Sequence, residues 1–183
     1  MTNKPLDPFE KPDTPGPRPF AIGYTKSNGE GLFYGGLFFA FGFVVLGLFG
    51  GVDMLAYLAI VPLGAAFWYF PMIDRSNPQL AANDEGLFIE RIGFIDWDNI
   101  QTMALSKTAV RSIELVTLEI DLASSLPEAI KKKHVFPSWK SFMTRNWSKS
   151  SQPDGTDHLA IQLNTLEGMP DEILDRLRDY REV

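Results

Sequence analysis

The sequence predicts a membrane protein of the α+β class, in which a two-helix transmembrane hairpin precedes a small domain of strands that ends in one α-helix. Three observations predict it: two adjacent apolar runs of membrane-spanning length, alternating apolar and polar residues in the second half, and an amphipathic stretch at the end. The mean hydropathy of the 183 residues is only -0.06, because the apolar runs and the charged remainder cancel.

Two uncharged runs follow each other near the start of the chain. The run 31–52 has 22 residues, and after Asp53 a second run of 20 follows. About 20 residues of α-helix cross a hydrocarbon core about 30 Å thick. We therefore expect transmembrane helices at 31–51 and 54–73, with a kink in the second helix at Pro62.

Basic residues are distributed unevenly around these runs. The chain before the first run carries Lys4, Lys11, Arg18 and Lys26, the loop between the runs carries none, and Arg75 follows the second run. Lysine and arginine are enriched in cytoplasmic flanks. This distribution predicts a multi-pass protein with both termini in the cytoplasm.

The composition divides the chain into three parts. Residues 1–30 form a proline-rich tail, with six prolines among the first 19 residues, and we expect it to be extended or disordered or to lie along a partner. The hairpin occupies 31–73. Residues 74–183 form the cytoplasmic domain, which carries an unusual basic and aromatic insertion at 124–151.

Alternation and amphipathicity predict the elements of the domain. Strands are expected at 112–122 and 157–164, where every second residue is apolar, and two shorter strands should flank Gly93. The last element, 170–181, is expected to be an α-helix that begins with Pro170.

The first apolar run carries a stripe of small side chains. Gly36, Ala40, Val44 and Gly47 recur at spacings of four, four and three, which places them on one helical face. Small residues let helices approach closely in a membrane. The stripe packs either against the second helix or against another protein. Neither run holds an ionisable residue of the kind that ion paths and proton relays need, which argues against a transport function for this hairpin.

The arrangement resembles the bacterial PH-like membrane proteins, in which a pleckstrin-homology-type domain follows two N-terminal helices. The motifs that carry the resemblance are the turn from Leu80 through Gly86 and the element Ile95, Trp97 and Ile100, both within "NPQLAANDEGLFIERIGFIDWDNI". The resemblance covers 31–183. It implies a bacterial inner (cytoplasmic) membrane and a PH-like small β-barrel or sheet closed by the C-terminal helix. Because such domains mostly bind or scaffold, it implies little about activity.

The acidic pair Asp96 and Asp98 flanks Trp97 in this element. In an extended strand both carboxylates would share the outward face, and Trp97 would anchor the core. We expect a structural role for the pair.

The insertion contains the most unusual stretch, "LPEAIKKKHVFPSWKSFMTRNWSK" at 126–149. Six basic residues stand against one acidic residue there, a charge of +5 within a chain of net charge -6. Aromatic and methionine side chains recur at helical spacing, which predicts a helix that is apolar on one face and basic on the other. Such a helix is a lid on the core, a contact with anionic membrane lipid or a docking site for a partner. The contact residues are Lys131, Lys132, Lys133, Phe136, Trp139, Lys140, Met143, Arg145 and Trp147.

Motifs for catalysis are missing from the sequence. The chain has two histidines and no cysteine, no ligand spacing typical of zinc, no glycine-rich phosphate loop and no nucleophile elbow. The acidic balance disfavours nucleic acid. No cofactor is predicted, although the aromatic-rich runs would accommodate a bound lipid.

We therefore expect a non-catalytic accessory protein that docks on a larger integral membrane complex, such as a respiratory or photosynthetic assembly. The alternative is a membrane-anchored PH-like module that works alone and binds lipid or another ligand.

Overall fold

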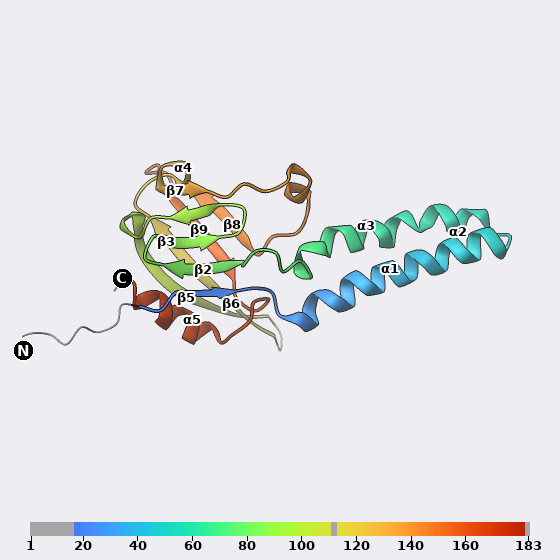
Figure 1. Cartoon of the computed structure of the whole chain (residues 1–183), viewed down its shortest axis with the longest axis horizontal. Helices are drawn as coiled ribbons and strands as arrows, with labels where there is room; N and C mark the ends of the chain where they lie inside the picture. Colours follow the sequence, from blue (N-terminus) through green and yellow to red (C-terminus); the bar gives the residue numbers. More distant parts are fainter. Residues whose placement is uncertain (1–16, 111–112, 182–183) are drawn as a thin grey trace, which may run out of the picture.

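A long helical hairpin projects from a domain of two antiparallel sheets (Figure 1). This computed structural model describes residues 17–110 and 113–181, so that the first 16 residues of the expected tail lie outside the described part.

The first sheet has five strands in the order β1-β2-β3-β4-β7, and each neighbouring pair is antiparallel. The turn between its second and third strands falls at Asp84 and Glu85, as expected, and the next turn ends at Gly93. Gly93 has a φ of 116°, and a β-carbon there would lie 2.1 Å from the carbonyl oxygen of Lys132. The strands are β1 (Phe20–Ile22), β2 (Leu80–Asn83), β3 (Gly86–Ile89), β4 (Gly93–Ile95) and β7 (Ile130–Lys133).

The second sheet has four strands in the order β5-β6-β9-β8. The C-terminal helix α5 (Pro170–Arg178) packs against β5 and β6. The expected alternation is confirmed, because the inward residues Leu118, Ile120, Leu122, Leu159 and Ile161 are all fully buried. The strands are β5 (Ile100–Val110), β6 (Ile113–Leu122), β8 (Trp147–Ser151) and β9 (Asp157–Gln162), and the one-turn helix α4 (Leu126–Ala129) follows β6.

One hydrophobic core joins the two sheets and α5. Leu87 and Ile95 reach it from the first sheet, Ile120 from the second, and Leu177 from the helix. We expected either a small β-barrel or a sheet. Within the described residues the strands form two separate sheets and no closed barrel.

The hairpin consists of α1 (Lys26–Phe49), α2 (Asp53–Leu58), α3 (Ile60–Tyr69) and the 3₁₀ turn η1 (Phe70–Met72). Its two arms are long and apolar enough to cross a membrane, by length and composition. The first helix begins at Lys26, earlier than the expected start at residue 31. A kink was expected at Pro62, which has no N–H to donate to the preceding turn, and the structure interrupts the second arm at Ala59, within that turn.

The predicted small-residue stripe lies inside the hairpin. A β-carbon on Gly36 would stand 2.8 Å from the carbonyl oxygen of Pro62, and one on Gly47 would stand 2.5 Å from the backbone nitrogen of Ala56. Ala40 is buried between them, whereas Val44 is 37% exposed and lies at the margin. The stripe is therefore used for packing between the two arms.

The hairpin is inserted between two adjacent strands of one sheet. β1 precedes it and β2 follows it, and they pair with Phe20 opposite Ala82 and Ile22 opposite Leu80. The expected tail, 1–30, did not include this strand. As Figure 1 shows, both feet of the hairpin therefore meet the domain at the same end.

Replacing Gly47 with valine should destabilise the hairpin, because the new side chain would overlap Ala56. Overpacking of this kind costs about 1–3 kcal/mol. Gly42→Val makes the same change on the same helix, where no atom lies within 4 Å of the new β-carbon. Thermal unfolding of the purified full chain should separate the two variants, and an equal loss in both would contradict the packing.

Candidate functional site at the base of the hairpin

Apart from the one-turn helix α4, the insertion contains no α-helix, so the prediction of an amphipathic helix through its aromatic residues is wrong. After β7 the chain runs through the 3₁₀ turn η3 (Ser138–Phe142) and enters β8. Two features prevent a continuous helix: Pro137 lacks an N–H and disfavours helical geometry at Phe136, and β7 pairs with β4 through Ile130, Lys132 and Lys133. The helical spacing of the aromatic residues was therefore coincidental.

The four residues of the expected apolar face separate. Phe136 stacks on the imidazole two residues before it, at a centroid distance of 6.3 Å. Trp147 packs against the domain core and donates its indole N–H to the carbonyl of Glu90 at 2.9 Å. Only Trp139 and Met143 come together, and they do so at the base of the hairpin.

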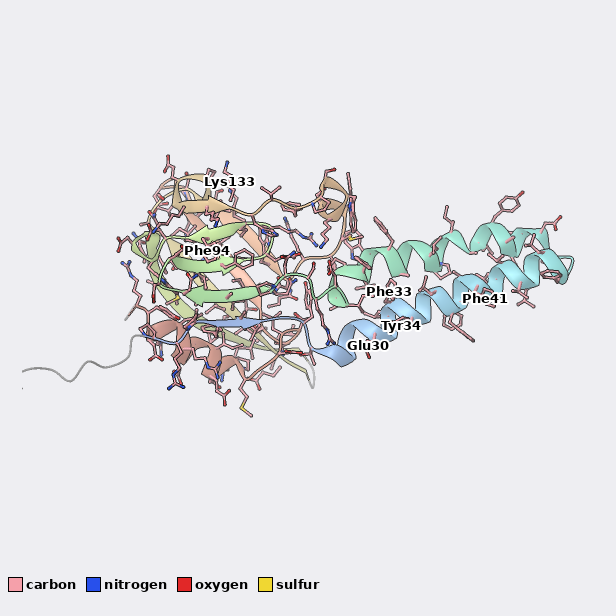
Figure 2. All side chains as sticks on the ribbon, viewed as in Figure 1. Glu30, Phe33, Tyr34, Phe41, Phe94 and Lys133 are labelled. Atoms are coloured by element: carbon pink, nitrogen blue, oxygen red, sulfur yellow. The ribbon has the colours of Figure 1, made fainter. Side chains whose placement is uncertain are left out.

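The basic residues separate in the same way. Lys131, Lys132 and Lys133 are exposed on β7, an edge strand, and Figure 2 shows Lys133 on the domain, away from the hairpin. The guanidinium of Arg145 lies over a tryptophan ring of β8, 4.5 Å from its centroid. Lys140 alone is buried.

Asp157 closes the base of the insertion. Its carboxylate accepts bonds from the N–H of Leu126 at 2.7 Å and from the hydroxyl of Ser151 at 2.6 Å, and Lys149 stands 3.1 Å away. Together these donors outweigh burial and lower the pKa of Asp157 to about 2, with the Leu126 N–H contributing most. One carboxylate thus ties the two ends of the insertion together.

An ion pair joins the insertion to the hairpin. The ammonium of Lys140 stands 2.5 Å from a carboxylate oxygen of Asp74, which lies just beyond η1. Partial burial opposes ionisation of Asp74, but the bonds from Lys140 and from the backbone N–H of Ser76 outweigh it and hold the pKa of Asp74 below its ordinary value.

Aromatic and backbone contacts accompany this ion pair. The ring of Trp139 lies 6.3 Å from that of Phe67 and 6.0 Å from that of Phe70, measured between centroids. The backbone N–H of Thr144 donates to the carbonyl of Trp68 at 3.1 Å. η3 and the residues after it therefore form a clamp, Trp139 to Thr144, on the base of the hairpin.

Arg91 holds the clamp from the domain side. Its guanidinium donates to the carbonyls of Met143 at 3.1 Å and Thr144 at 2.7 Å. Arg91 has a φ of 67°, in the left-handed region that non-glycine residues seldom adopt. Such strain persists where surrounding contacts over-determine the conformation, and here those contacts are the two carbonyls and the carboxylate of Glu90, 3.4 Å away.

The domain side of the junction is a buried polar layer. Glu90 and Arg91 lie beside Tyr24, whose pKa is raised by burial and by the charge of Glu90. The side-chain amides of Gln79 and Asn146 are also buried, and in the part of the chain that the structure describes Asn146 has no side-chain hydrogen-bond partner.

An apolar groove of about 440 Å³ opens between the clamp and the hairpin. It is lined by residues of both arms and of the clamp: Phe33, Leu37, Leu63, Ala66, Phe67, Phe70, Trp139 and Met143. A second, more polar cleft of about 510 Å³ adjoins the linker after the hairpin, where Asp74, Arg75 and Glu167 contribute to its walls.

The acidic pair has a structural place. Trp97 begins a 3₁₀ turn, so the expectation of an extended strand there is wrong. The side chain of Asp96 accepts the backbone N–H of Asp98 and caps this turn. Trp97 is half-buried against the core and donates its indole N–H to the carbonyl of Asn83 at 2.8 Å.

Comparisons identify no relative: no protein-family model, curated protein or solved structure matches the chain. Within residues 17–110 and 113–181, no group of three or more acidic or histidine side chains could hold a metal ion.

Sequence reasoning missed Asp74 and Arg91, and it placed Lys140 on the basic face of a helix, as a contact for membrane lipid or a partner. Asp74 and Lys140 are 66 positions apart, so no local pattern links them. One signal was present: Pro137 excludes a continuous helix and would have separated Trp139 and Lys140 from the lysines of β7.

Replacing Asp74 with asparagine should cost about 1.5–3 kcal/mol at neutral pH, the usual contribution of a hydrogen bond to a charged group. Because the pKa of Asp74 is lowered in the folded protein, this contribution is present above the ordinary aspartate pKa of about 3.9 and is lost as the pH falls through the folded value. Chemical unfolding of the full chain at several pH values should show the gap to wild type narrowing below about pH 4.

The matched control is Lys133→Met, which removes an exposed lysine of the same insertion. Its unfolding free energy should stay within about 0.5 kcal/mol of wild type, whereas Lys140→Met should resemble Asp74→Asn. A Lys140→Met protein as stable as the control would refute the clamp.

Proposed function

We propose that this chain is a non-catalytic accessory subunit of a bacterial inner membrane. Its hairpin crosses the bilayer and docks laterally on a larger integral membrane complex, of the respiratory or photosynthetic kind. The domain, with both termini, lies on the cytoplasmic side against the same complex. The pairing of β1 with β2 supports a common side for the N-terminal strand and the domain, and the basic flanks support the cytoplasm.

A second glycine stripe on α1 carries the proposal. Gly36 and Gly47 pack against the other arm inside the hairpin, but a β-carbon on Gly35 or Gly42 would have no atom within 4 Å. Seven residues are close to two helical turns, so Gly35 and Gly42 lie on one face. Because small residues permit close helix contacts in lipid, where the hydrophobic effect provides little drive, an unused stripe supports a helix from another protein as its partner.

Large side chains border this stripe. Tyr34, Phe38 and Phe41 are between 59% and 73% exposed, and Figure 2 marks two of them along α1. Alternating bulky side chains and open glycines offer both protrusions and recesses to a partner. In plain lipid the glycines would serve no packing purpose and would weaken the helix.

The clamp gives the docking surface a second part. The ion pair of Lys140 with Asp74 and the bonds from Arg91 hold the domain in one orientation on the hairpin. A complex that binds α1 therefore also receives the domain at a defined position. The resemblance to PH-like proteins supports a binding or scaffolding role for that domain.

A second function, binding of anionic lipid by a module that works alone, is favoured by the exposed lysines of β7. Of Lys131, Lys132 and Lys133, only Lys131 has a carboxylate within 4 Å in the described part of the chain, that of Asp96 at 3.8 Å. These cations are available to phosphate groups, but they lie on β7, and Figure 2 shows Lys133 away from the hairpin.

Native-gel migration tests the accessory role. The tagged chain, extracted from its own membranes in mild detergent, should migrate within a large assembly whose other members are identified by mass spectrometry. The double variant Gly35→Leu/Gly42→Leu should reduce the assembly-bound fraction at least several-fold, because leucine blocks close approach. Gly64→Leu, which fills an equally open position on α3, should not.

Wild-type migration as a monomer or homo-oligomer would contradict the accessory role and favour the lipid-binding module. A loss of assembly that is equal in the double variant and in Gly64→Leu would contradict the assignment of docking to α1.

A further inference from the structure

We propose that the apolar groove between the clamp and the hairpin binds one acyl chain of a membrane phospholipid. This assignment goes beyond the accessory role, and it depends on the hairpin crossing the bilayer. The groove, at about 440 Å³, falls within the range of about 300–1,000 Å³ that is typical of small-molecule sites.

The chemistry of the lining selects an apolar ligand. The arms of the hairpin contribute aliphatic and aromatic side chains, and the clamp contributes the indole of Trp139 and the thioether of Met143. Ala66, 1% exposed, is the small residue on its wall. Methionine is flexible and adapts its shape to irregular partners, as an acyl chain with many conformers requires.

The position of the groove selects lipid as the source. Leu37, Leu63 and Phe67 belong to the two arms that are long and apolar enough to span a membrane. Leu63 is 51% exposed and Phe67 is 48% exposed, so the groove is continuous with the outer surface of the hairpin. A ligand that enters it from that surface comes from the hydrocarbon layer.

The clamp bounds the groove at its domain end. Trp139 and Met143 lie against Phe67 and Phe70, at the foot of the second arm. A partner helix that ran along both arms would meet η3 at this point. A flexible acyl chain that ends at the headgroup level would fit in the groove without meeting η3.

The four tryptophans differ in whether the indole N–H has an acceptor, and this difference indicates where a lipid headgroup would lie. Trp97 and Trp147 donate their indole N–H groups to backbone carbonyls of the domain. Trp139 and Trp68, 43% and 49% exposed at the base of the hairpin, have no such acceptor among the described residues. Tryptophan at membrane interfaces pairs an apolar ring with a polar N–H. The Trp139 N–H is thus free for an ester carbonyl or phosphate oxygen above the acyl chain.

Lipid retention by the full chain tests the site. The protein is reconstituted with phosphatidylethanolamine and phosphatidylglycerol, released into mild detergent and weighed by native mass spectrometry. Wild type should retain a phospholipid that survives release, and Leu63→Trp, which fills the groove, should lower this retention several-fold. Leu48→Trp makes the same change on an exposed part of α1 that does not line the groove, and it should match wild type.

Equal retention by all three proteins, or none by wild type, would overturn the proposal. A second experiment identifies the occupant of the groove and does not require that the Leu63→Trp variant folds correctly. A benzophenone amino acid replaces Leu37 in the full chain, which is irradiated in its native membranes. An adduct with the mass of a phospholipid supports the site, and an adduct to another protein overturns it. Neither readout depends on migration within a larger complex.

Discussion

The pairing of β1 with β2 across the hairpin is the contact on which the remaining structure depends. Paired strands lie about 4.8 Å apart, whereas packed helices lie about 8–10 Å apart, so the sheet holds the two feet of the hairpin closer than the arms themselves require. The chain must diverge between strand and helix, and the small residues Gly36, Ala40 and Gly47 then allow the arms to stay in contact along their length. The segment 23–25 is fixed as well, because it bonds to residues 165–167 beyond β9.

The clamp adds a second attachment, far from the first in the sequence. β1 and β2 tie the feet to one edge of the five-stranded sheet, and the insertion reaches the hairpin after leaving the opposite edge at β7. Two attachments from opposite edges resist tilting of the hairpin in a way that one flexible linker cannot. This explains why a strained conformation at Arg91 and a partly buried ion pair at Asp74 are tolerated: both hold the orientation of the domain. In an accessory subunit, that orientation decides what the domain presents to its host.

The local pattern of apolar and polar residues predicted those elements in which each side chain's polarity matches its burial. The apolar arms, the alternating strands β6 and β9 and the amphipathic α5 all follow from periodicity. β5 was missed because its pairing shifts between Ile100 and Thr102, which breaks the alternation: Ile100 and Met103 are both buried. β1 was missed because three residues are too few to show a period. The candidate site was predicted only as a set of residues. Trp139, Lys140 and Met143 do lie together, but their partners Asp74, Phe67 and Arg91 come from distant segments, and tertiary contact alone brings them there.

We propose that the hairpin crosses a membrane with the N-terminal strand and the domain on one side. Because the chain contains no cysteine, single cysteines at Arg18, Val52 and Ser150 would report sidedness without background. Spheroplasts, in which the inner membrane is sealed and accessible from outside, would be treated with a maleimide that cannot cross membranes, before and after permeabilisation. We expect Val52→Cys to react before permeabilisation, and Arg18→Cys and Ser150→Cys to react only after it. The proposed topology would be contradicted if only one of Arg18→Cys and Ser150→Cys needed permeabilisation to react. It would also be contradicted if all three variants reacted without permeabilisation.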